Sequence, residues 1–282
     1  VITEELSCEV HRARRLRSGG FGLDLGEDGF GDPPSDEEIE GAIADAINEA
    51  NREIVKYATE ADLGGTYTTV VVSVCLGEKL HYGWVGDSRL YVVNESHGKI
   101  SPLTKDHTKV QQYEDEGRID QIEAHVHPDG NEILRAIGGR GGTEPGDVHH
   151  QVDTGTVPLF RDDIVLLTSD GLIDAQTDYV ELYREYVTSD RDEEVGQRVL
   201  DAVVTDDDIR EIVLEEPTIH DAADRFIEFS NEKGGKDNIS VIIFRDDGLP
   251  ASPSPKASPL PERSIDPDDS LEERETVVKE SQ

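Results

Sequence analysis

Residues 66–94, TYTTVVVSVCLGEKLHYGWVGDSRLYVVN, decide the fold class of this chain. The stretch contains three β-branched or apolar runs, at residues 66–76, 79–85 and 89–94. A Gly-Glu turn separates the first two runs, and the corner Gly86-Asp87-Ser88 precedes the third. Runs of this composition and length, joined by short turns, predict neighbouring antiparallel strands.

Outside this stretch, blocks of strands are separated from blocks of helices. Two more apolar runs, 163–168 and 239–245, predict strands. Ser35 and Glu38 form a capping-box pattern that predicts a helix over 36–60. Further helices are expected at residues 1–17, 174–188, 190–204 and 219–233. This arrangement predicts an α+β fold, a β-sandwich of two antiparallel sheets flanked by helices.

The chain is expected to form one domain over residues 1–247, followed by a disordered tail over 248–282. The tail holds six Pro, six Ser and eight acidic residues and no aromatic residue, a composition that buries too little apolar surface to fold. The sequence contains no Met, even at position 1. We therefore expect that Val1 is not the biological start and that the domain is incomplete at its N-terminus.

The charge of the chain excludes some partners. Its 27 basic and 63 acidic residues give a net charge of −36, which excludes nucleic-acid binding through a basic face and disfavours anionic membrane surfaces. Two interpretations stay open: an acidic protein that binds cations or basic partners, and a solvated shell adapted to a salt-rich cytosol. The acidic residues are spread over the whole chain, which favours the second interpretation.

A cytoplasmic location is expected from other features. Cys8 and Cys75 are the only cysteines and are far apart in the sequence, so they are interpreted as reduced thiols. No apolar stretch reaches the roughly 20 residues that a membrane helix needs, and no signal peptide is visible. The sequence does not indicate an oligomeric state.

Three aspartates, Asp87, Asp170 and Asp237, each lie beside an apolar run. Carboxylates at strand ends can converge on Mg²⁺ or Mn²⁺, which prefer oxygen ligands. A water bound to such an ion becomes a nucleophile near neutral pH. These residues therefore predict metal-assisted hydrolysis, although each aspartate alone could equally cap a turn.

Six segments in order resemble the metal-dependent serine/threonine protein phosphatases, the PPM or type 2C family, over roughly residues 1–245. The segments are Gly64-Gly-Thr66, Trp84-Val-Gly-Asp-Ser-Arg89, Leu103-Thr-Lys-Asp-His-Thr108, Ile133-Leu-Arg-Ala-Ile-Gly138, Leu166-Leu-Thr-Ser-Asp-Gly-Leu-Ile-Asp174 and Lys236-Asp-Asn-Ile-Ser240. The resemblance implies a central β-sandwich with a two-metal site at one end and a third, weaker metal beside it. It also implies hydrolysis of phosphoserine and phosphothreonine in protein substrates by a metal-activated water.

The resemblance also implies roles for individual residues. Asp170 and Asp237 are similar to direct ligands of the metal pair. Asp87 is similar to the ligand of the third metal, with Asp174 beside it as a further ligand or, alternatively, as an N-cap of the following helix. Asn238 is similar to a residue that contacts a metal-bound water. The expected cofactors are thus two or three Mg²⁺ or Mn²⁺ ions.

The chain departs from the family pattern at its beginning. In the family, an Arg near the N-terminus binds the substrate phosphate, and a later Asp-Gly-x-Gly-Gly segment supplies a bridging carboxylate. Neither precedes the helix expected at the start of this sequence. We therefore expect impaired activity for this chain and an active full-length parent. The alternative is a catalytically inactive, phosphatase-like regulatory or binding module.

Other polar residues have competing interpretations. The pairs His125-x-His127 and His149-His150 suggest zinc, but no cysteine is near them, and structural zinc sites need four settled ligands. His107 is interpreted as a loop residue and not as a catalytic acid. Arg135 is expected either to form a structural salt bridge or to contact substrate. The region 109–147 corresponds to the family's flap beside the active site.

Overall fold

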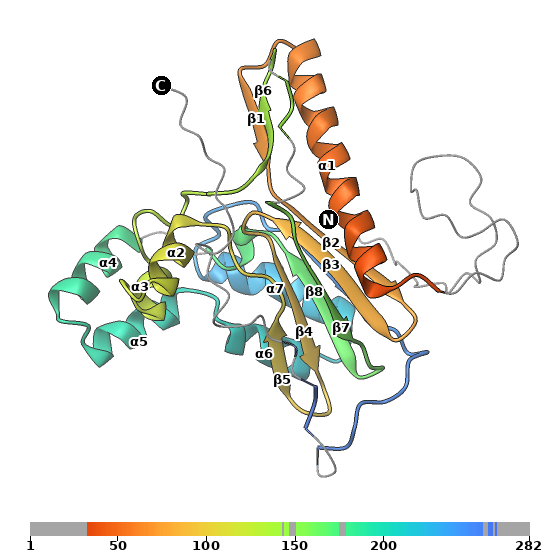
Figure 1. Ribbon diagram of the computed structural model, residues 1–282. Helices are drawn as coiled ribbons and strands as arrows, with labels where there is room; N and C mark the ends of the chain where they lie inside the picture. The colour runs from red at the N-terminus through yellow and green to blue at the C-terminus, as the bar shows by residue number, and fades with distance from the viewer. Residues whose placement is uncertain are drawn as a thin grey trace, which may run out of the picture.

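The computed structural model describes residues 33–142, 144–146, 151–174, 179–255, 259–261 and 263. The helix expected over 1–17 and the pair His149-His150 lie outside these residues. Within them the chain forms antiparallel sheets and flanking helices (Figure 1), which confirms the predicted α+β fold. No helix in the described ranges combines the length and the apolar character needed to cross a membrane.

Two sheets make the body of the molecule. One has the strand order β5-β4-β8-β9 and the other the order β2-β3-β7. The first contains β4 (Arg89–Asn94), β5 (Lys99–Pro102), β8 (Asp163–Thr168) and β9 (Val241–Phe244). The second contains β2 (Val70–Leu76), β3 (Lys79–Val85) and β7 (Asp153–Pro158). All pairings within them are antiparallel.

The two-residue alternation of β4 divides its side chains between two cores. Leu90 and Val92 pack with Trp84 of β3 and other buried residues of the second sheet. Tyr91 and Val93 pack on the opposite face, against Phe226 and other helical residues. Successive side chains of a strand point to opposite faces, so β4 is buried on both sides, between the second sheet and the helices.

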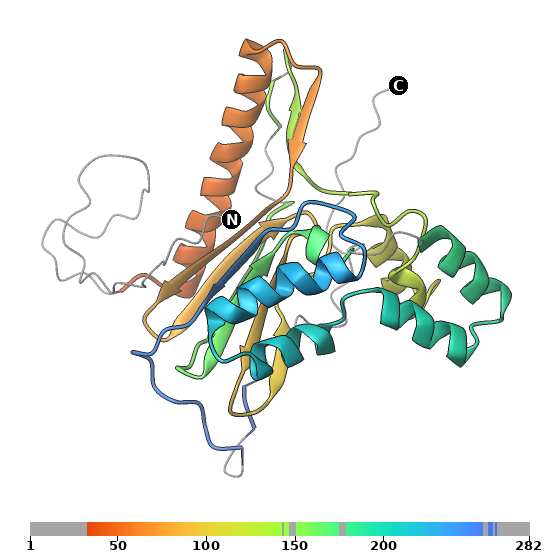
Figure 2. The ribbon, with the colours of Figure 1, turned by 180° about the vertical axis from the view of Figure 1, so that it is seen from behind.

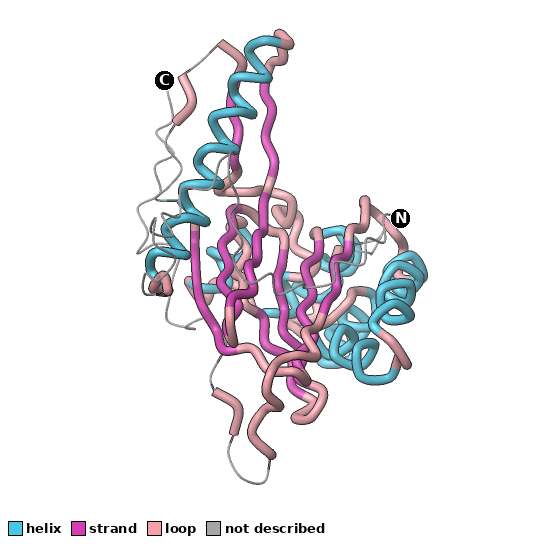
Figure 3. Tube along the Cα trace, turned by 90° about the vertical axis from the view of Figure 1, so that its right-hand side faces the viewer, coloured by secondary structure: helices cyan, strands magenta, loops and turns pink. Residues whose placement is uncertain are grey.

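Helices cover both outer faces of the sandwich (Figures 2 and 3). On one side, α1 (Asp36–Glu60) begins at the predicted capping box of Ser35 and Glu38. Its residues Ile39, Ile43 and Ile47 are buried with Val85 of β3. On the other side lie α6 (Asp206–Glu215) and α7 (Ile219–Glu232), whose apolar residues pack on the four-stranded sheet.

A smaller helical lobe stands beside the sandwich (Figure 1). It contains α2 (Lys109–Asp115), α3 (Gln121–Ala124), α4 (Tyr179–Thr188) and α5 (Glu193–Ala202). Val126, Tyr186, Val195 and Val199 form its own buried cluster. The lobe therefore joins part of the expected flap region to helices that come much later in the chain.

The expected single strand over 66–76 is two strands. β1 (Gly65–Thr68) pairs with β6 (Ile137–Arg140) in a separate two-stranded sheet, and β2 begins at Val70. Thr69 lies between them, and a Cβ at Gly86, whose φ is +113°, would collide with its side chain. The chain leaves one sheet and enters the next at Thr69, where the β3–β4 corner presses against it.

The segment after residue 247 is not wholly a free tail. The side chain of Leu249 is buried, and Pro250 accepts a hydrogen bond from the Arg161 N–H at 2.9 Å. Ser252 donates its N–H to the Asp162 carboxylate at 2.7 Å. Arg263 forms a buried ion pair with Asp163 at 2.8 Å. Local polar groups and one buried cation thus join these described residues to the domain, and the disordered tail over 248–282 stays a prediction.

Candidate active site

Strand register brings three of the predicted carboxylates to one end of the four-stranded sheet. Arg89 at the start of β4 pairs with Thr168 at the end of β8, and Thr168 pairs with Val241 at the start of β9. Asp87 precedes β4, Asp170 follows β8, and Asp237 precedes β9. All three therefore extend past the same end of the sheet.

Hydrogen bonds lock the segment of Asp170 to the segment of Asp237. Ser169 Oγ donates to the Asn238 carbonyl at 3.1 Å and accepts from the Ser240 N–H at 3.0 Å. The Ser169 N–H donates to the Ser240 carbonyl at 3.1 Å. A Cβ at Gly171 would overlap the Asn238 carbonyl oxygen, so only glycine permits this approach. The two aspartates are held on adjoining backbones.

A cavity of about 830 Å³ opens at this end of the sheet. Asp87, Asp170 and Asp174 line it, together with residues of α2, α5 and α6. Asp170 begins the short 3₁₀ helix η2 (Asp170–Leu172), and Asp174 follows that helix. The N–H of Asp174 donates to the Asp170 carbonyl at 2.9 Å, so this turn directs both residues to the cavity.

Burial, together with a neighbouring aspartate, raises the pKa of Asp87, Asp170 and Asp174. Burial raises the pKa of Asp87 to about 7, and the negative charge of Asp170 adds to the shift. Burial also raises the pKa of Asp170, and the charge of Asp237 adds to that shift. The pKa of Asp174 rises to about 6 through burial, while the Arg89 guanidinium opposes the rise. Carboxylates that repel one another in a low-dielectric site favour a cation between them.

The donor set fits a hard divalent ion. In the described ranges, no three His, Cys, Asp or Glu side chains are grouped closely enough to enclose a metal. Instead, the aspartates interact electrostatically in pairs: Asp170 with Asp87, and Asp237 with Asp170. Mg²⁺ is commonly held by one or two carboxylates and retains several waters. Neighbouring carboxylates beside a roomy cavity satisfy that requirement.

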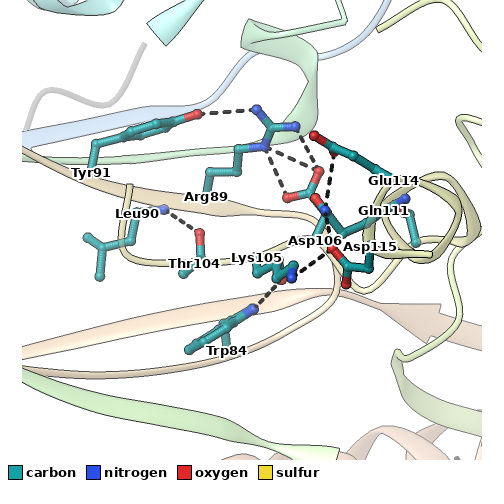
Figure 4. Close-up of polar contacts among 11 residues, drawn as sticks. Trp84, Arg89, Leu90, Tyr91, Thr104, Lys105, Asp106, Gln111, Glu114 and Asp115 are labelled. Carbon is teal, nitrogen blue, oxygen red and sulfur yellow. Dashed lines mark hydrogen bonds and ion pairs between the residues drawn. The ribbon is translucent and has the colours of Figure 1, made fainter. Parts of the chain in front are cut away.

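Arg89 lines the cavity, and its guanidinium pairs with Asp106 (Figure 4). Its Nε and Nη2 donate to the two oxygens of Asp106 at 3.0 and 2.8 Å, and its Nη1 donates to the Tyr91 hydroxyl at 3.3 Å. Nearby, Lys105 pairs with Asp115 at 2.8 Å. Arg89 and Asp106 lie within the family-like sequence motifs, which predicted no role for either residue. Only their position in those motifs could have indicated a role, because the Arg89–Asp106 ion pair forms only in the folded chain.

The histidines of the zinc hypothesis do not form a metal cluster within the described residues. His125 lines the cavity, and burial lowers its pKa to about 4. His127 Nδ1 accepts the Asp129 N–H at 3.1 Å, and its ring packs edge-on against Tyr113 and Tyr183. These contacts give His127 a packing role in the helical lobe.

Arg135 forms a salt bridge within the protein. Its Nη1 lies 3.3 Å from Asp153 Oδ1, and only 5% of its side chain is exposed. Of the two sequence interpretations, the structure therefore supports the structural ion pair. His107 is fully buried and lies in the connection between β5 and α2.

Fold and cavity together define an α+β domain in which three aspartates extend past one end of a β-sandwich. Residues 32–239 match the family model of protein phosphatase 2C. The serine/threonine phosphatase stp of Listeria monocytogenes is 34% identical over 212 residues, which cover 75% of this chain and 69% of that protein. This chain belongs to the protein phosphatase 2C family.

Solved structures agree with this assignment. The serine/threonine phosphatase PstP/Ppp of Mycobacterium tuberculosis superposes with a TM-score of 0.55 at 29% identity, over 72% of this chain and 70% of that one. The catalytic domain of PstP in complex with 2 manganese ions superposes with a TM-score of 0.52 at 26% identity, over 75% and 73%. Family membership makes this chain a hydrolase of the metal-dependent serine/threonine phosphatase type.

Proposed function

We propose that this chain hydrolyses phosphoserine and phosphothreonine in protein substrates, with Asp87, Asp170, Asp174 and Asp237 holding two or three Mg²⁺ or Mn²⁺ ions. One observation carries the proposal: strand register takes Asp87, Asp170 and Asp237 past the same end of the sheet. When bound, such ions activate a water for attack on phosphorus and neutralise the phosphoryl oxygens.

The chain's own residues have distinct tasks in this proposal. Asp170 and Asp237, on adjoining backbones that Ser169 joins by hydrogen bonds, would hold the metal pair. Asp87 and Asp174, which both line the cavity, would hold a further ion. Arg89 keeps Asp106 oriented and offsets part of the negative charge around the site. Asn238 directly follows Asp237 and would contact a metal-bound water, as the family resemblance implies.

The cavity is the proposed entry for the phosphorylated residue. Its volume of about 830 Å³ lies within the range of ligand sites, and its walls come from both the sandwich and the helical lobe. Residues of α2 and of the loop after α3 form part of those walls. The flap expected over 109–147 is thereby proposed to contact the substrate protein and to influence substrate choice.

Release of phosphate from an aryl phosphate or a phosphopeptide, measured with and without added Mn²⁺, tests the proposal. Asp170→Asn and Asp237→Asn are expected to lower turnover at least a hundredfold and to weaken Mn²⁺ binding. Asp224→Asn is the matched control, because Asp224 lies on α7 with 61% of its side chain exposed. Normal turnover and metal binding in either site variant would overturn the assignment. Metal-dependent turnover by the unmodified chain would exclude the alternative of a catalytically inactive binding module.

We also propose a cytoplasmic protein with a salt-adapted surface and no nucleic-acid or membrane partner. The net charge of −36 supports this proposal, since such a surface repels anionic polymers and lipids and is screened only at high ionic strength. Retention on heparin or on anionic vesicles at 0.15 M salt would contradict it.

A further inference from the structure

His107 holds Gly86, the residue before Asp87, through two hydrogen bonds to the Gly86 backbone. The Gly86 N–H donates to His107 Nδ1 at 3.0 Å, and the His107 N–H donates to the Gly86 carbonyl at 2.9 Å. Gly86 has a φ of +113° and presses against Thr69. His107 therefore fixes the conformation of the corner from which the Asp87 side chain projects.

These contacts determine the tautomer of the His107 ring. Because Nδ1 accepts the Gly86 N–H, the ring proton is on Nε2. That nitrogen lies 3.0 Å from Asp153 Oδ2 and donates to it. The other oxygen of Asp153 accepts from Arg135 Nη1 at 3.3 Å. Arg135, Asp153 and His107 thus form one chain of hydrogen bonds that ends at Gly86.

The chain of bonds is shielded from water. The exposed fractions of His107, Asp153 and Arg135 are 0, 6 and 5%. Trp84 stacks on the His107 ring, with 5.7 Å between ring centroids and 19° between planes. The His107 carbonyl accepts the Leu134 N–H at 2.7 Å. Neither the ring nor its neighbours can rotate without breaking buried contacts.

We propose that His107 is a positioning residue, which with Asp153 and Arg135 aims the Asp87 carboxylate at a divalent cation. The inference rests on the proposed metal role of Asp87. Asp153 holds the ring proton on Nε2, and this leaves Nδ1 as an acceptor for the Gly86 N–H. Loss of that acceptor frees the Val85-Gly86 peptide and leaves only the His107 N–H to hold the Gly86 carbonyl. Hydrogen-bond partners that orient a metal ligand typically change metal affinity by about 10–100-fold.

Trp84, the only tryptophan in the chain, gives a direct readout that does not depend on turnover. Mn²⁺ is titrated into the full chain while Trp84 fluorescence is followed, and calorimetry measures the same binding. His107→Phe keeps a ring beside Trp84 and removes both ring hydrogen bonds. Asp153→Asn keeps the shape and weakens control of the tautomer. His107→Asn places an amide oxygen near the former Nδ1 and is the rescue variant.

We expect His107→Phe and Asp153→Asn to weaken the Mn²⁺ binding that depends on Asp87 by about tenfold or more, and His107→Asn to recover most of it. Wild-type affinity in His107→Phe or, should that variant not fold, in Asp153→Asn would overturn the positioning role. Asp87→Asn separates the two claims. If it leaves Mn²⁺ binding unchanged, the metal assignment of Asp87 fails, and the inference fails with it. If it removes binding that Asp153→Asn retains, only the inference fails.

Discussion

Gly171 lies against the carbonyl oxygen of Asn238 so closely that a Cβ at Gly171 would overlap it. Gly171 follows β8 and Asn238 precedes β9, so both lie at the same end of these paired strands. Each is next to a predicted metal ligand, Asp170 or Asp237. The approach of their backbones therefore sets how near Asp170 and Asp237 can come.

Gly171→Ala is expected to push these two segments apart. Forcing an extra methyl group into a tight site costs about 1–3 kcal/mol, and the shift should also lower Mn²⁺ affinity. Urea unfolding and calorimetric titration measure both effects. Gly41→Ala in α1 is the matched control, because a Cβ there meets nothing within 4 Å and alanine stabilises helices by about 0.5–1 kcal/mol. Equal stability of the two variants would contradict the prediction.

The Arg89–Asp106 pair is expected to behave as one unit. Its bidentate geometry beside the cavity is available to arginine and not to lysine. Arg89→Lys, Asp106→Asn and the double variant should give non-additive free energies of unfolding, with a coupling of about 0.5–3 kcal/mol. Additive values from urea melts would show that the two side chains act independently.

The ion pair of Arg263 with Asp163 is expected to anchor the C-terminal segment. Only 2 and 0% of these side chains are exposed, and removing one partner of a buried pair costs roughly 3–5 kcal/mol. Arg263→Ala should show a loss of that order in thermal or urea unfolding. Arg245→Ala is the surface control, since the exposed fractions in its pair with Glu95 are 40 and 41% and such pairs contribute about 0–1 kcal/mol.

Acid should destabilise the fold through His107. Burial lowers its pKa below the ordinary value of 6.5, and Arg135 acts in the same direction, while Asp153 and Asp106 oppose the shift. The unfolded chain therefore binds more protons below pH 6.5. The contribution to stability is complete above that pH and is lost as pH falls toward the folded pKa.

Urea melts between pH 7.5 and 5 check this expectation. His107→Asn should lose less stability over that range than the wild-type chain, because the titrating ring is gone. His220→Asn, a change at a side chain that is 66% exposed, should follow the wild-type curve. Asp87 and Asp174, whose pKa values are raised, act in the opposite direction in all three proteins and cancel in the comparison. Parallel curves for wild type and His107→Asn would contradict the argument.

The acidic surface predicts salt-dependent stability. A net charge of −36 opposes compaction, and the Debye length falls from about 10 Å at 0.1 M to about 3 Å at 1 M salt. The melting temperature should rise steadily with KCl up to molar concentrations. Sucrose at equal osmolality, which does not screen charge, should have a smaller effect. A melting temperature that is independent of KCl would leave the salt-adapted interpretation without support.

Several elements of the fold were predictable because local chemistry determines them. The capping box of Ser35 and Glu38 begins α1 as expected, and apolar runs became β3, β4 and β8. β6 and β7 were missed, since Ile-Gly-Gly-Arg and Asp-Thr-Gly-Thr-Val-Pro have loop-like compositions and become strands only by pairing with distant partners. The helix α6, with three acidic residues in its first turn, was also missed.

The aspartates of the candidate site could be predicted from the sequence, but the hydrogen bonds that orient them could not. Motif order indicated Asp87, Asp170, Asp174 and Asp237, whose roles as ligands stay predictions. The hydrogen bonds that aim Asp87 join residues 86, 107, 135 and 153, and no local pattern reveals a network of that kind. Burial of Arg263 was unpredictable for the same reason, because it depends on Asp163 at the opposite end of β8 from Asp170.

The three carboxylates at the sheet end belong to chain segments that meet only when β4, β8 and β9 pair. An unfolded chain therefore has no formed binding site for a divalent ion, and the ion would bind the native state alone. Such selective binding stabilises in proportion to the logarithm of free ion concentration. Newly made chains would thus fold before they bind the ion. The ion would stabilise the folded state and would not direct folding.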